Sequence, residues 1–198
     1  MLKNKKIGFG ITGSFCSINK IFDVMQEIIN SGAEIFCFAT PNVLTINNRF
    51  NQADKVIKKL NEIAKKEIIS EIQEAEKFGP FNPLDCMVIA PITGNSLARL
   101  SHGIIDNAVL MATKTTLRNG KPIVLAPFTN DALSLNGENI MKLMSKKNFF
   151  FVPFGQDDPI KKPTSMTSDL KKLKLAIVNA LEYKQIQPVI IQNFESKE

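Results

Sequence analysis

The stretch Lys6-Ile7-Gly8-Phe9-Gly10-Ile11-Thr12-Gly13-Ser14 decides the fold, because it joins a short apolar run to a glycine-containing turn. After this turn, apolar residues recur at the spacing of one helix face until Gly32, and a second short apolar run covers residues 34–39. Glycine is typical of the position just past a helix end. The order strand, turn, helix and strand predicts a βαβ unit.

The same alternation continues along the rest of the chain. Further strands are expected at residues 86–90, 122–126 and 149–152. Apolar residues at helical spacing are found over residues 53–78 with one break, 96–117, 139–146 and 168–183. Repeated βα units of this kind build a parallel sheet that is covered by helices. The chain is therefore predicted to be an α/β protein.

The composition is that of an ordinary globular chain. The 198 residues carry 25 Lys and Arg against 19 Asp and Glu, a net charge of +6, and 44% of them are hydrophobic. These values exclude collagen-like, coiled-coil, disordered and disulfide-scaffold proteins. We expect a single domain over residues 1–191 and a polar C-terminal tail over residues 192–198. No apolar run is long enough to cross a bilayer and no signal peptide is recognised, so a cytoplasmic location is expected.

The cysteines and the histidine give no sign of a metal site. Cys16, Cys37 and Cys86 are widely separated and form neither a disulfide framework nor a cluster of metal ligands. We expect them to be buried, reduced thiols. His102 is the single histidine of the sequence, so a zinc site with several histidine ligands is excluded. No metal is therefore expected.

Two groups of lysines raise the question of nucleic-acid binding. The lysines within residues 55–66 alternate with glutamates rather than with aromatic residues, which is typical of a solvated helix face. Neither nucleic acid nor a membrane is therefore expected as a partner. The excess positive charge instead favours a small anionic ligand.

Proline follows four of the predicted strands, in the segments Ala39-Thr40-Pro41, Ala90-Pro91, Ala126-Pro127 and Val152-Pro153. Because proline cannot continue a strand ladder, each strand is expected to end there. In an open parallel sheet these ends lie at one edge, where ligands bind. Hydroxyl and amide side chains gather just beyond them, at Thr12, Ser14, Thr40, Asn42, Thr93, Asn95, Ser96, Thr129 and Asn130. This gathering indicates a binding site, although the capping of turns and helices uses the same residue types.

The first turn matches the letters of a dinucleotide-binding motif through Gly8, Gly10 and Gly13, but the first two glycines fall inside the strand. That motif also needs an acidic residue at the end of the second strand, where this chain has Thr40. Taken as residues 10–14, the turn offers backbone N–H groups and hydroxyls at a helix N-terminus, which suit a phosphate. A monophosphate such as that of FMN fits these groups, and a plain tight turn explains the loop equally well.

Residues 90–107, together with the turn at residues 10–14 and with residues 121–127, resemble the flavoprotein family that includes flavin prenyltransferases, phosphopantothenoylcysteine decarboxylases and peptidyl-cysteine decarboxylases. The resemblance implies a three-layer Rossmann-like (flavodoxin-type) parallel sheet with helices on both faces. It also implies FMN at the interface of a homo-oligomer, a trimer or a multiple of a trimer. The implied cofactor-binding residues are Thr12, Gly13 and Ser14 at the phosphate end, Thr40 near the ribityl chain or ring, and Thr93, Asn95 and Ser96 on a bend that faces the first turn across a subunit interface.

Residues 154–159 and 162–165 are similar to the branch of this family that oxidises a dihydropyridine dicarboxylate to pyridine-2,6-dicarboxylate in sporulating bacteria. That branch implies a small dianionic substrate, a partner A subunit that binds NAD(P), and a place in the cytoplasm of the mother cell. The segment around residues 155–163 is a loop without periodicity, which is typical of a lid or an interface arm, and a plain surface connection explains it equally well. Lys161 or Lys162 on this segment would supply a cation for one carboxylate. The implied substrate-binding residues are Asn95 on a carboxylate, Phe128, Asn130 and Lys162.

The chain also departs from the decarboxylases of the family. Residues 78–85 contain no histidine where those enzymes carry a catalytic one, and the C-terminal half contains no cysteine. Cysteine decarboxylation is therefore disfavoured, and no catalytic residue is assigned. His102 and Asp106 are expected to be structural, with Asp106 capping or bracing the next helix. Two alternatives remain, a flavin prenyltransferase, for which three arginines are few, and a non-catalytic scaffold for an NAD(P)-dependent partner.

Overall fold

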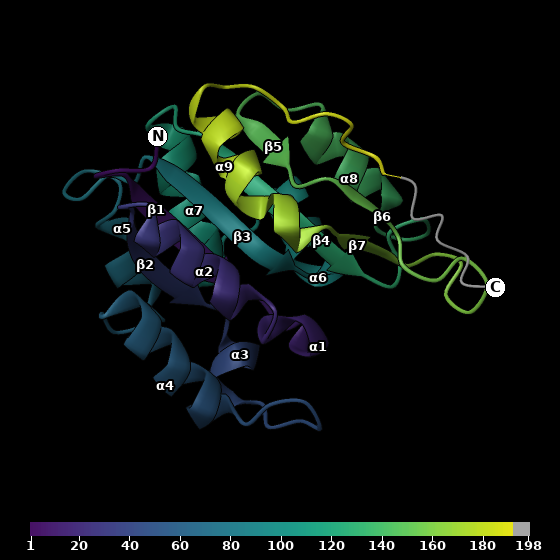
Figure 1. Cartoon of the computed structure of the whole chain (residues 1–198), viewed down its shortest axis with the longest axis horizontal. Helices are drawn as coiled ribbons and strands as arrows, with labels where there is room; N and C mark the ends of the chain where they lie inside the picture. The colour runs from purple at the N-terminus through teal and green to yellow at the C-terminus, as the bar shows by residue number, and fades with distance from the viewer. Residues whose placement is uncertain (192–198) are drawn as a thin grey trace.

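The computed structural model describes residues 1–191, which form a seven-stranded sheet with helices on both faces (Figure 1). The strands are β1 (Lys6–Ile11), β2 (Glu34–Ala39), β3 (Cys86–Ile92), β4 (Ile123–Thr129), β5 (Phe149–Phe151), β6 (Phe154–Gln156) and β7 (Met166–Ser168). Five of them are parallel in the order β2-β1-β3-β4-β5, which is the flavodoxin-type order. The predicted α/β layer structure is confirmed.

The helices divide between the two faces of the sheet. They are α1 (Phe15–Ile18), α2 (Ile21–Asn30), α3 (Pro41–Thr45), α4 (Ala53–Ala64), α5 (Ile72–Glu76), α6 (Gly94–Ser101), α7 (Ala108–Arg118), α8 (Gly137–Met144) and α9 (Leu173–Leu181). Apolar residues of α2, α4 and α9 join one buried cluster with Phe9 and Val88 of the sheet. Residues of α5 to α8 join a second cluster with Met87 and Ile89. Successive side chains of a strand point to opposite faces, so β3 contributes to both clusters.

The glycines of β1 have a packing role. A Cβ at Gly10 would lie 2.7 Å from Val109 Cγ1 of α7, and one at Gly8 would lie 2.5 Å from Leu84 Cδ1. Both distances are too short for a real contact, so only glycine lets these neighbours lie so close to the strand. The letters of the dinucleotide motif thus coincide with the tight packing of α7 against β1.

The prediction that proline ends the strands is wrong at two positions. β3 continues through Pro91 to Ile92, and β4 continues through Pro127 to Thr129. The β3–β4 register shifts between Ile89 and Ile92, which accommodates the missing proline N–H donor. The proline carbonyls still accept hydrogen bonds from side chains on neighbouring segments, Pro91 from Thr12 and Pro127 from Ser168.

The continuous helical pattern over residues 96–117 is also corrected, because two helices occupy it. α6 ends at Ser101, and α7 begins at Ala108 after the cap residue Asn107. Gly103 has a φ of +71°, and its N–H donates to the carbonyl of Leu100. A glycine in this left-handed conformation stops a helix at its C-terminal end. The single break predicted within residues 53–78 is confirmed by α4 and α5.

The segment beyond β5 is not a plain loop. β6 and β7 form an antiparallel pair, and β7 pairs with Phe128 and Thr129 at the end of β4. The sheet is therefore mixed rather than wholly parallel. Residues 157–165 connect these two strands and project from the end of the sheet (Figure 1).

The cysteines are only partly as expected. Cys37 and Cys86 are buried, but Cys16 is exposed because it lies on the one-turn helix α1 at the surface. Burial raises the pKa of the Cys37 thiol to about 12.

Among the described residues, no helix has the length and apolar character needed to span a bilayer. The predicted polar tail at residues 192–198 lies outside the described part of the chain.

Candidate functional site

Thr12 joins the bend after β1 to the bend after β3. Its hydroxyl donates to the carbonyl of Pro91 at 2.8 Å and accepts from the N–H of Thr93 at 2.9 Å. Thr12 is 1% exposed, so water does not compete for either bond. The two bends therefore meet inside one chain, whereas the family resemblance places them across a subunit interface. Because its hydroxyl bonds both a donor and an acceptor on the second bend, Thr12 fixes the two bends relative to each other.

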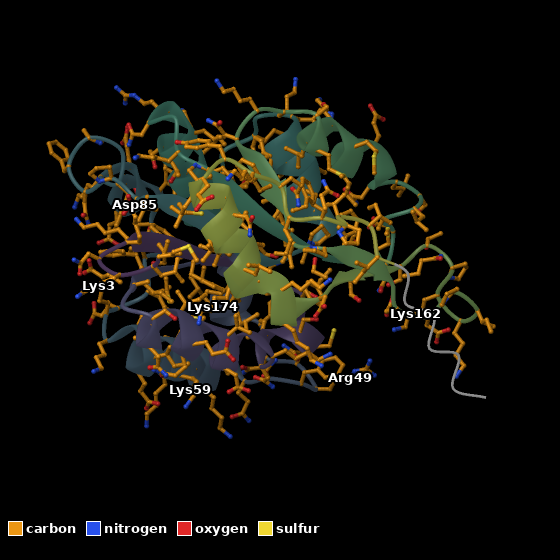
Figure 2. The ribbon with its side chains drawn as sticks, turned by 45° about the horizontal axis from the view of Figure 1, so that its top comes forward. Lys3, Arg49, Lys59, Asp85, Lys162 and Lys174 are labelled. Atoms are coloured by element: carbon orange, nitrogen blue, oxygen red, sulfur yellow. The ribbon has the colours of Figure 1, made fainter. Side chains whose placement is uncertain are left out.

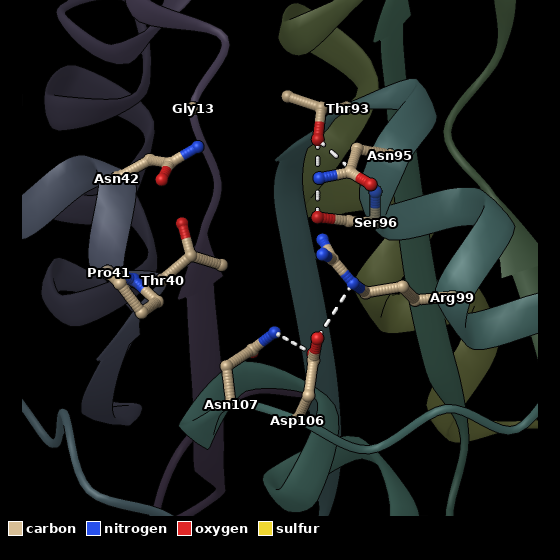
Figure 3. Close-up of a pocket in the computed structure, with 10 residues that line it drawn as sticks. All are labelled: Gly13, Thr40, Pro41, Asn42, Thr93, Asn95, Ser96, Arg99, Asp106 and Asn107. Atoms are coloured by element: carbon tan, nitrogen blue, oxygen red, sulfur yellow. Dashed lines mark hydrogen bonds and ion pairs between the residues drawn. The ribbon is translucent and has the colours of Figure 1, made fainter.

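A cavity of about 310 Å³ opens beside this junction (Figure 3). We call it the polar chamber, and its lining consists of Gly13, Thr40, Pro41, Asn42, Thr93, Asn95, Ser96, Arg99, Asp106 and Asn107. Figure 3 shows Thr40 and Asn42 on one wall, with Thr93, Asn95 and Ser96 on the facing wall. Five of the predicted cofactor-binding residues meet here: Gly13, Thr40, Thr93, Asn95 and Ser96.

Three helices begin at the polar chamber. Thr40 is the N-cap of α3, Thr93 that of α6 and Asn107 that of α7. The Thr93 hydroxyl accepts from the N–H of Ser96 at 3.4 Å, and Asn107 Oδ1 accepts from the N–H of Leu110 at 3.1 Å. The N-terminus of a helix carries partial positive charge. The chamber is therefore electrostatically suited to a ligand with anionic or electron-rich groups.

The polar chamber also contains an ion pair that the sequence does not predict there. Arg99 Nε lies 2.8 Å from Asp106 Oδ2, with the two side chains 36% and 44% exposed. Asp106 Oδ1 accepts from Asn107 Nδ2 at 2.9 Å. Asp106 thus braces the loop between α6 and α7, as expected, but the cap of α7 is Asn107. The polar chamber therefore contains two charged groups besides the hydroxyls and amides.

A second cavity of about 350 Å³ lies on the other side of Gly13 and Thr93, which line both cavities. We call it the aromatic cleft, because Phe15, Phe50 and Phe128 contribute to its walls. Its other lining residues include Ser14, Cys16, Asn130, Asp157, Lys162 and Ser165. Three of the four predicted substrate-binding residues, Phe128, Asn130 and Lys162, meet here, while Asn95 lies in the polar chamber.

The rim of the aromatic cleft is formed by two projecting loops. Figure 2 shows Arg49, the neighbour of Phe50, and Lys162 at the same end of the molecule. Phe50 is 48% exposed, and the Arg49 guanidinium lies 4.7 Å from its ring centroid. The loop is fixed by Asn51, whose Nδ2 donates to the Phe15 carbonyl at 2.7 Å. An exposed aromatic ring on a well-anchored loop is available to a ligand.

Lys162 and Asp157 form the charged part of the aromatic cleft. Lys162 Nζ lies 3.0 Å from Asp157 Oδ2. Burial, the largest single influence on Asp157, would raise the pKa of its carboxyl, but hydrogen bonds from Ser165 and Lys162 together lower it. The hydrogen bond to Asp157 raises the pKa of Lys162. The lysine is therefore a cation at neutral pH and is held at the cleft by its partner.

His102 stays outside both cavities. It is the C-cap of α6, and its Nδ1 lies 2.9 Å from the Ala98 carbonyl and from Ser101 Oγ. The expected structural role of this side chain agrees with those contacts.

Sequence reasoning missed Arg99, Phe50 and Asp157 as site residues. Arg99 and Asp106 both lie within the segment that carries the family resemblance, yet their pairing depends on the turn at Gly103. Phe50 had a weak signal, a lone aromatic residue in an asparagine-rich loop. Asp157 could only be recognised once β6 and β7 had placed it beside Lys162.

Comparisons with known proteins extend over the whole described chain. The model of the family described as "Flavoprotein" matches residues 1–192. The B subunit of dipicolinate synthase from Bacillus subtilis (strain 168) is 48% identical over 197 residues, which cover 100% of this chain and 98% of that protein. The crystal structure of the dipicolinate synthase B subunit from Bacillus halodurans has a TM-score of 0.90 at 44% identity and covers 98% of this chain and 99% of that one. The FMN-dependent cysteine decarboxylase SpaF shares the fold, with a TM-score of 0.68 at 19% identity over 91% of this chain and 99% of its own.

Proposed function

Because the chain belongs to the Flavoprotein family and is a close homologue of the dipicolinate synthase B subunit, we propose that it is the FMN-binding component of a dipicolinate synthase. The observation that carries this proposal is the shared wall of Gly13 and Thr93, at which the polar chamber and the aromatic cleft adjoin. A cofactor in the chamber and a substrate in the cleft would lie next to each other there. The enzyme would act in the cytoplasm of the mother cell during sporulation.

The polar chamber has the donors that FMN needs. Thr40, Asn95 and Ser96 supply hydroxyl and amide groups, which can bond the oxygen and nitrogen atoms of a flavin. A Cβ at Gly13 would make ordinary contacts with Asn42 and Phe15 at 3.6 Å, so the packing of the protein itself does not require glycine at this position. FMN bound there would supply a two-electron acceptor. Ser14 lines the cleft on the other side of the wall, so Thr12, Gly13 and Ser14 would act mainly through the turn that they form.

A second copy of the chain would complete the cofactor site. About 310 Å³ is at the lower end of the volume of small-molecule sites. A homo-oligomer, a trimer or a multiple of it, would close the open side of the polar chamber over FMN.

The aromatic cleft suits a planar dianion. Phe128 is a buried aromatic wall, and Lys162 supplies a positive charge at the rim. Asn130 and Ser165 lie together, with Ser165 Oγ donating to Asn130 Oδ1 at 3.3 Å. The ring of a pyridine dicarboxylate would pack against phenylalanine while Lys162 binds one carboxylate. Asn95, which lines the adjoining polar chamber, would contact the other carboxylate where the two cavities meet.

The proposed reaction is the oxidation of dihydrodipicolinate to dipicolinate. The substrate ring loses one hydride from a C–H bond and one proton, and it becomes aromatic. FMN on this chain or a nicotinamide on the A subunit would supply the two-electron acceptor, and solvent would take the proton. This chain would orient the ring and hold the two carboxylates, which is the main task when aromatisation drives the reaction.

The proposal is tested by reconstitution. Purified protein should show the visible absorption of an oxidised flavin, either as isolated or after addition of FMN. Dipicolinate formation should then be followed with the A subunit and NAD(P)⁺, with and without FMN. We expect product only when both proteins are present, and a higher rate with FMN. Equal rates with and without this chain would overturn the enzyme proposal, and equal rates for the flavin-free and the FMN-loaded protein would overturn the role of the flavin.

A further inference from the structure

Arg99 is the one cationic side chain in the lining of the polar chamber, as far as residues 1–191 define it. The chamber otherwise offers hydroxyl groups, amides and the carboxylate of Asp106. The side chain of Arg99 is 36% exposed and is paired with Asp106, so its charge is stable in the free protein and the guanidinium remains accessible to a ligand. The geometry of Arg99 shows which part of that charge remains available.

The contact with Asp106 occupies only one side of the guanidinium group. The ion pair joins Nε to Asp106 Oδ2 at 2.8 Å. Figure 3 shows the two terminal nitrogens of Arg99 directed toward Ser96, away from Asp106. Asp106 is itself fixed by the 2.9 Å hydrogen bond from Asn107. Arg99 is therefore oriented by one contact while its terminal N–H groups face the chamber.

The surroundings of these terminal nitrogens favour a negative charge. The starts of α6, with eight residues, and α7, with eleven residues, both lie at the chamber through Thr93 and Asn107. Their partial positive charges add to that of Arg99. The planar fork of an arginine also matches the oxygens of a phosphate or a carboxylate.

We propose that Arg99 binds an anionic oxygen group of the ligand in the polar chamber, a phosphate monoester or a carboxylate, and that Asp106 is a positioning residue for it. This inference rests on the proposed function, because the two sources of such a group are then the phosphate of FMN and a carboxylate of the dipicolinate-type substrate. The ion pair would serve a second purpose as well, the bracing of α6 against the start of α7.

Three variants and three ligands test the inference. Arg99→Met removes the charge, Arg99→Lys keeps it without the planar fork, and Arg118→Met removes an exposed arginine at the end of α7 as a matched control. Binding of FMN, of riboflavin, which has no phosphate, and of dipicolinate should be measured by calorimetry at low salt. Thermal unfolding of each variant without ligand measures the bracing role separately.

If the anion is the phosphate, Arg99→Met weakens FMN binding about tenfold or more and leaves riboflavin binding nearly unchanged. If it is the carboxylate, the same variant weakens dipicolinate binding and spares both flavins. Arg99→Lys should fall between the wild type and Arg99→Met, and Arg118→Met should match the wild type.

An unchanged affinity of Arg99→Met for FMN and dipicolinate would overturn the inference, whatever the change in unfolding temperature. Equal losses for FMN and riboflavin would also overturn it, since the phosphate would then play no part. The proposed function fails differently, when the wild-type protein binds no flavin at all. If the wild-type protein binds no flavin but Arg99→Met weakens dipicolinate binding, the anion site at Arg99 is still supported.

Discussion

The polar chamber and the aromatic cleft share the wall of Gly13 and Thr93, yet their linings differ in kind. The chamber is built from side chains at helix starts and from an arginine that an aspartate orients. The cleft combines phenylalanine rings with a lysine on a connection between two short strands. The difference shows that one edge of a sheet can provide two neighbouring sites, one suited to polar groups and one suited to a flat ring.

The largest effect is expected at Thr12, which joins the bend after β1 to the bend after β3. Thr12→Val keeps the shape of the side chain but removes the hydroxyl that pairs the Pro91 carbonyl and the Thr93 N–H. Two buried groups then lose their partner, so the free energy of unfolding should fall by about 2 to 4 kcal/mol. Urea denaturation measures this loss.

Thr45→Val is the matched control, because Thr45 is exposed and donates to the Pro41 carbonyl within its own short helix. Its free energy of unfolding should stay within about 0.5 kcal/mol of the wild type. Equal values for the two variants would show that Thr12 does not hold the bends together.

The shared wall itself is tested by Gly13→Ala. The added Cβ meets Asn42 and Phe15 at 3.6 Å, an ordinary contact, so stability should change little. Because Gly13 lines both cavities, the methyl group should reduce the affinity for FMN and for dipicolinate together, each by about tenfold, or ~1.4 kcal/mol. Calorimetric titration with each ligand measures the effect. A loss confined to one ligand would show that the two cavities do not share this wall functionally.

Lys162→Ala should affect the binding of one ligand and not that of the other. We expect dipicolinate binding to weaken roughly three- to tenfold, since the ammonium group is largely exposed and solvent screens its charge. FMN binding should remain unchanged, because Lys162 does not line the polar chamber. Lys161→Ala is the neighbouring control, as Lys161 lines neither cavity.

The pKa shifts fix the pH dependence of this effect. The pKa of Lys162 is raised and that of Asp157 is lowered, so neither group titrates between roughly pH 6 and 9. The ratio of wild-type to Lys162→Ala affinity should therefore be constant over that range. A ratio that changes strongly there would point to a different binding group.

Phe50→Ala should have the smallest effect. The ring is 48% exposed, so its loss should change the free energy of unfolding by no more than about 0.5 kcal/mol. If the ring packs on the substrate, dipicolinate affinity should fall about two- to threefold, or ~0.5 kcal/mol, the lower end of the range for an aromatic pair. Fluorescence or calorimetric titration can resolve this change, and an unaffected affinity would remove Phe50 from the site.

The parts of the fold that the sequence predicted well have strong local signals. β1 and β2 have the expected bounds because each is a short apolar run that ends in a clear break. β6 and β7 have three residues each and no such signal, since their strand conformation depends on pairing with each other and with β4. Pro91 and Pro127 misled the prediction because strand pairing continues past a register shift: Ile92 pairs with Pro127, and Phe128 pairs with Thr167 of β7.

The candidate site likewise has residues that the sequence could indicate and residues that it could not. The hydroxyl and amide residues around Thr93 could be chosen from their place after a strand and from the resemblance of their segment. The division of these residues between two cavities could not be foreseen, since it depends on how β3 and α6 bend past Gly13. Asp157 and Lys162 are close enough in sequence to pair, but only the β6–β7 connection holds that pair at the cleft.

The sequence by itself determined the order of the five parallel strands, the edge at which polar groups gather and the family to which the chain belongs. These features follow from local patterns, because apolar spacing and turn residues act over a few positions. Only the tertiary structure decided that Thr12 is a buried connector, that Arg99 faces a chamber and that the phenylalanines form a cleft. Such roles depend on contacts between residues far apart in the chain, and those contacts exist only when the sheet and its helices have packed together.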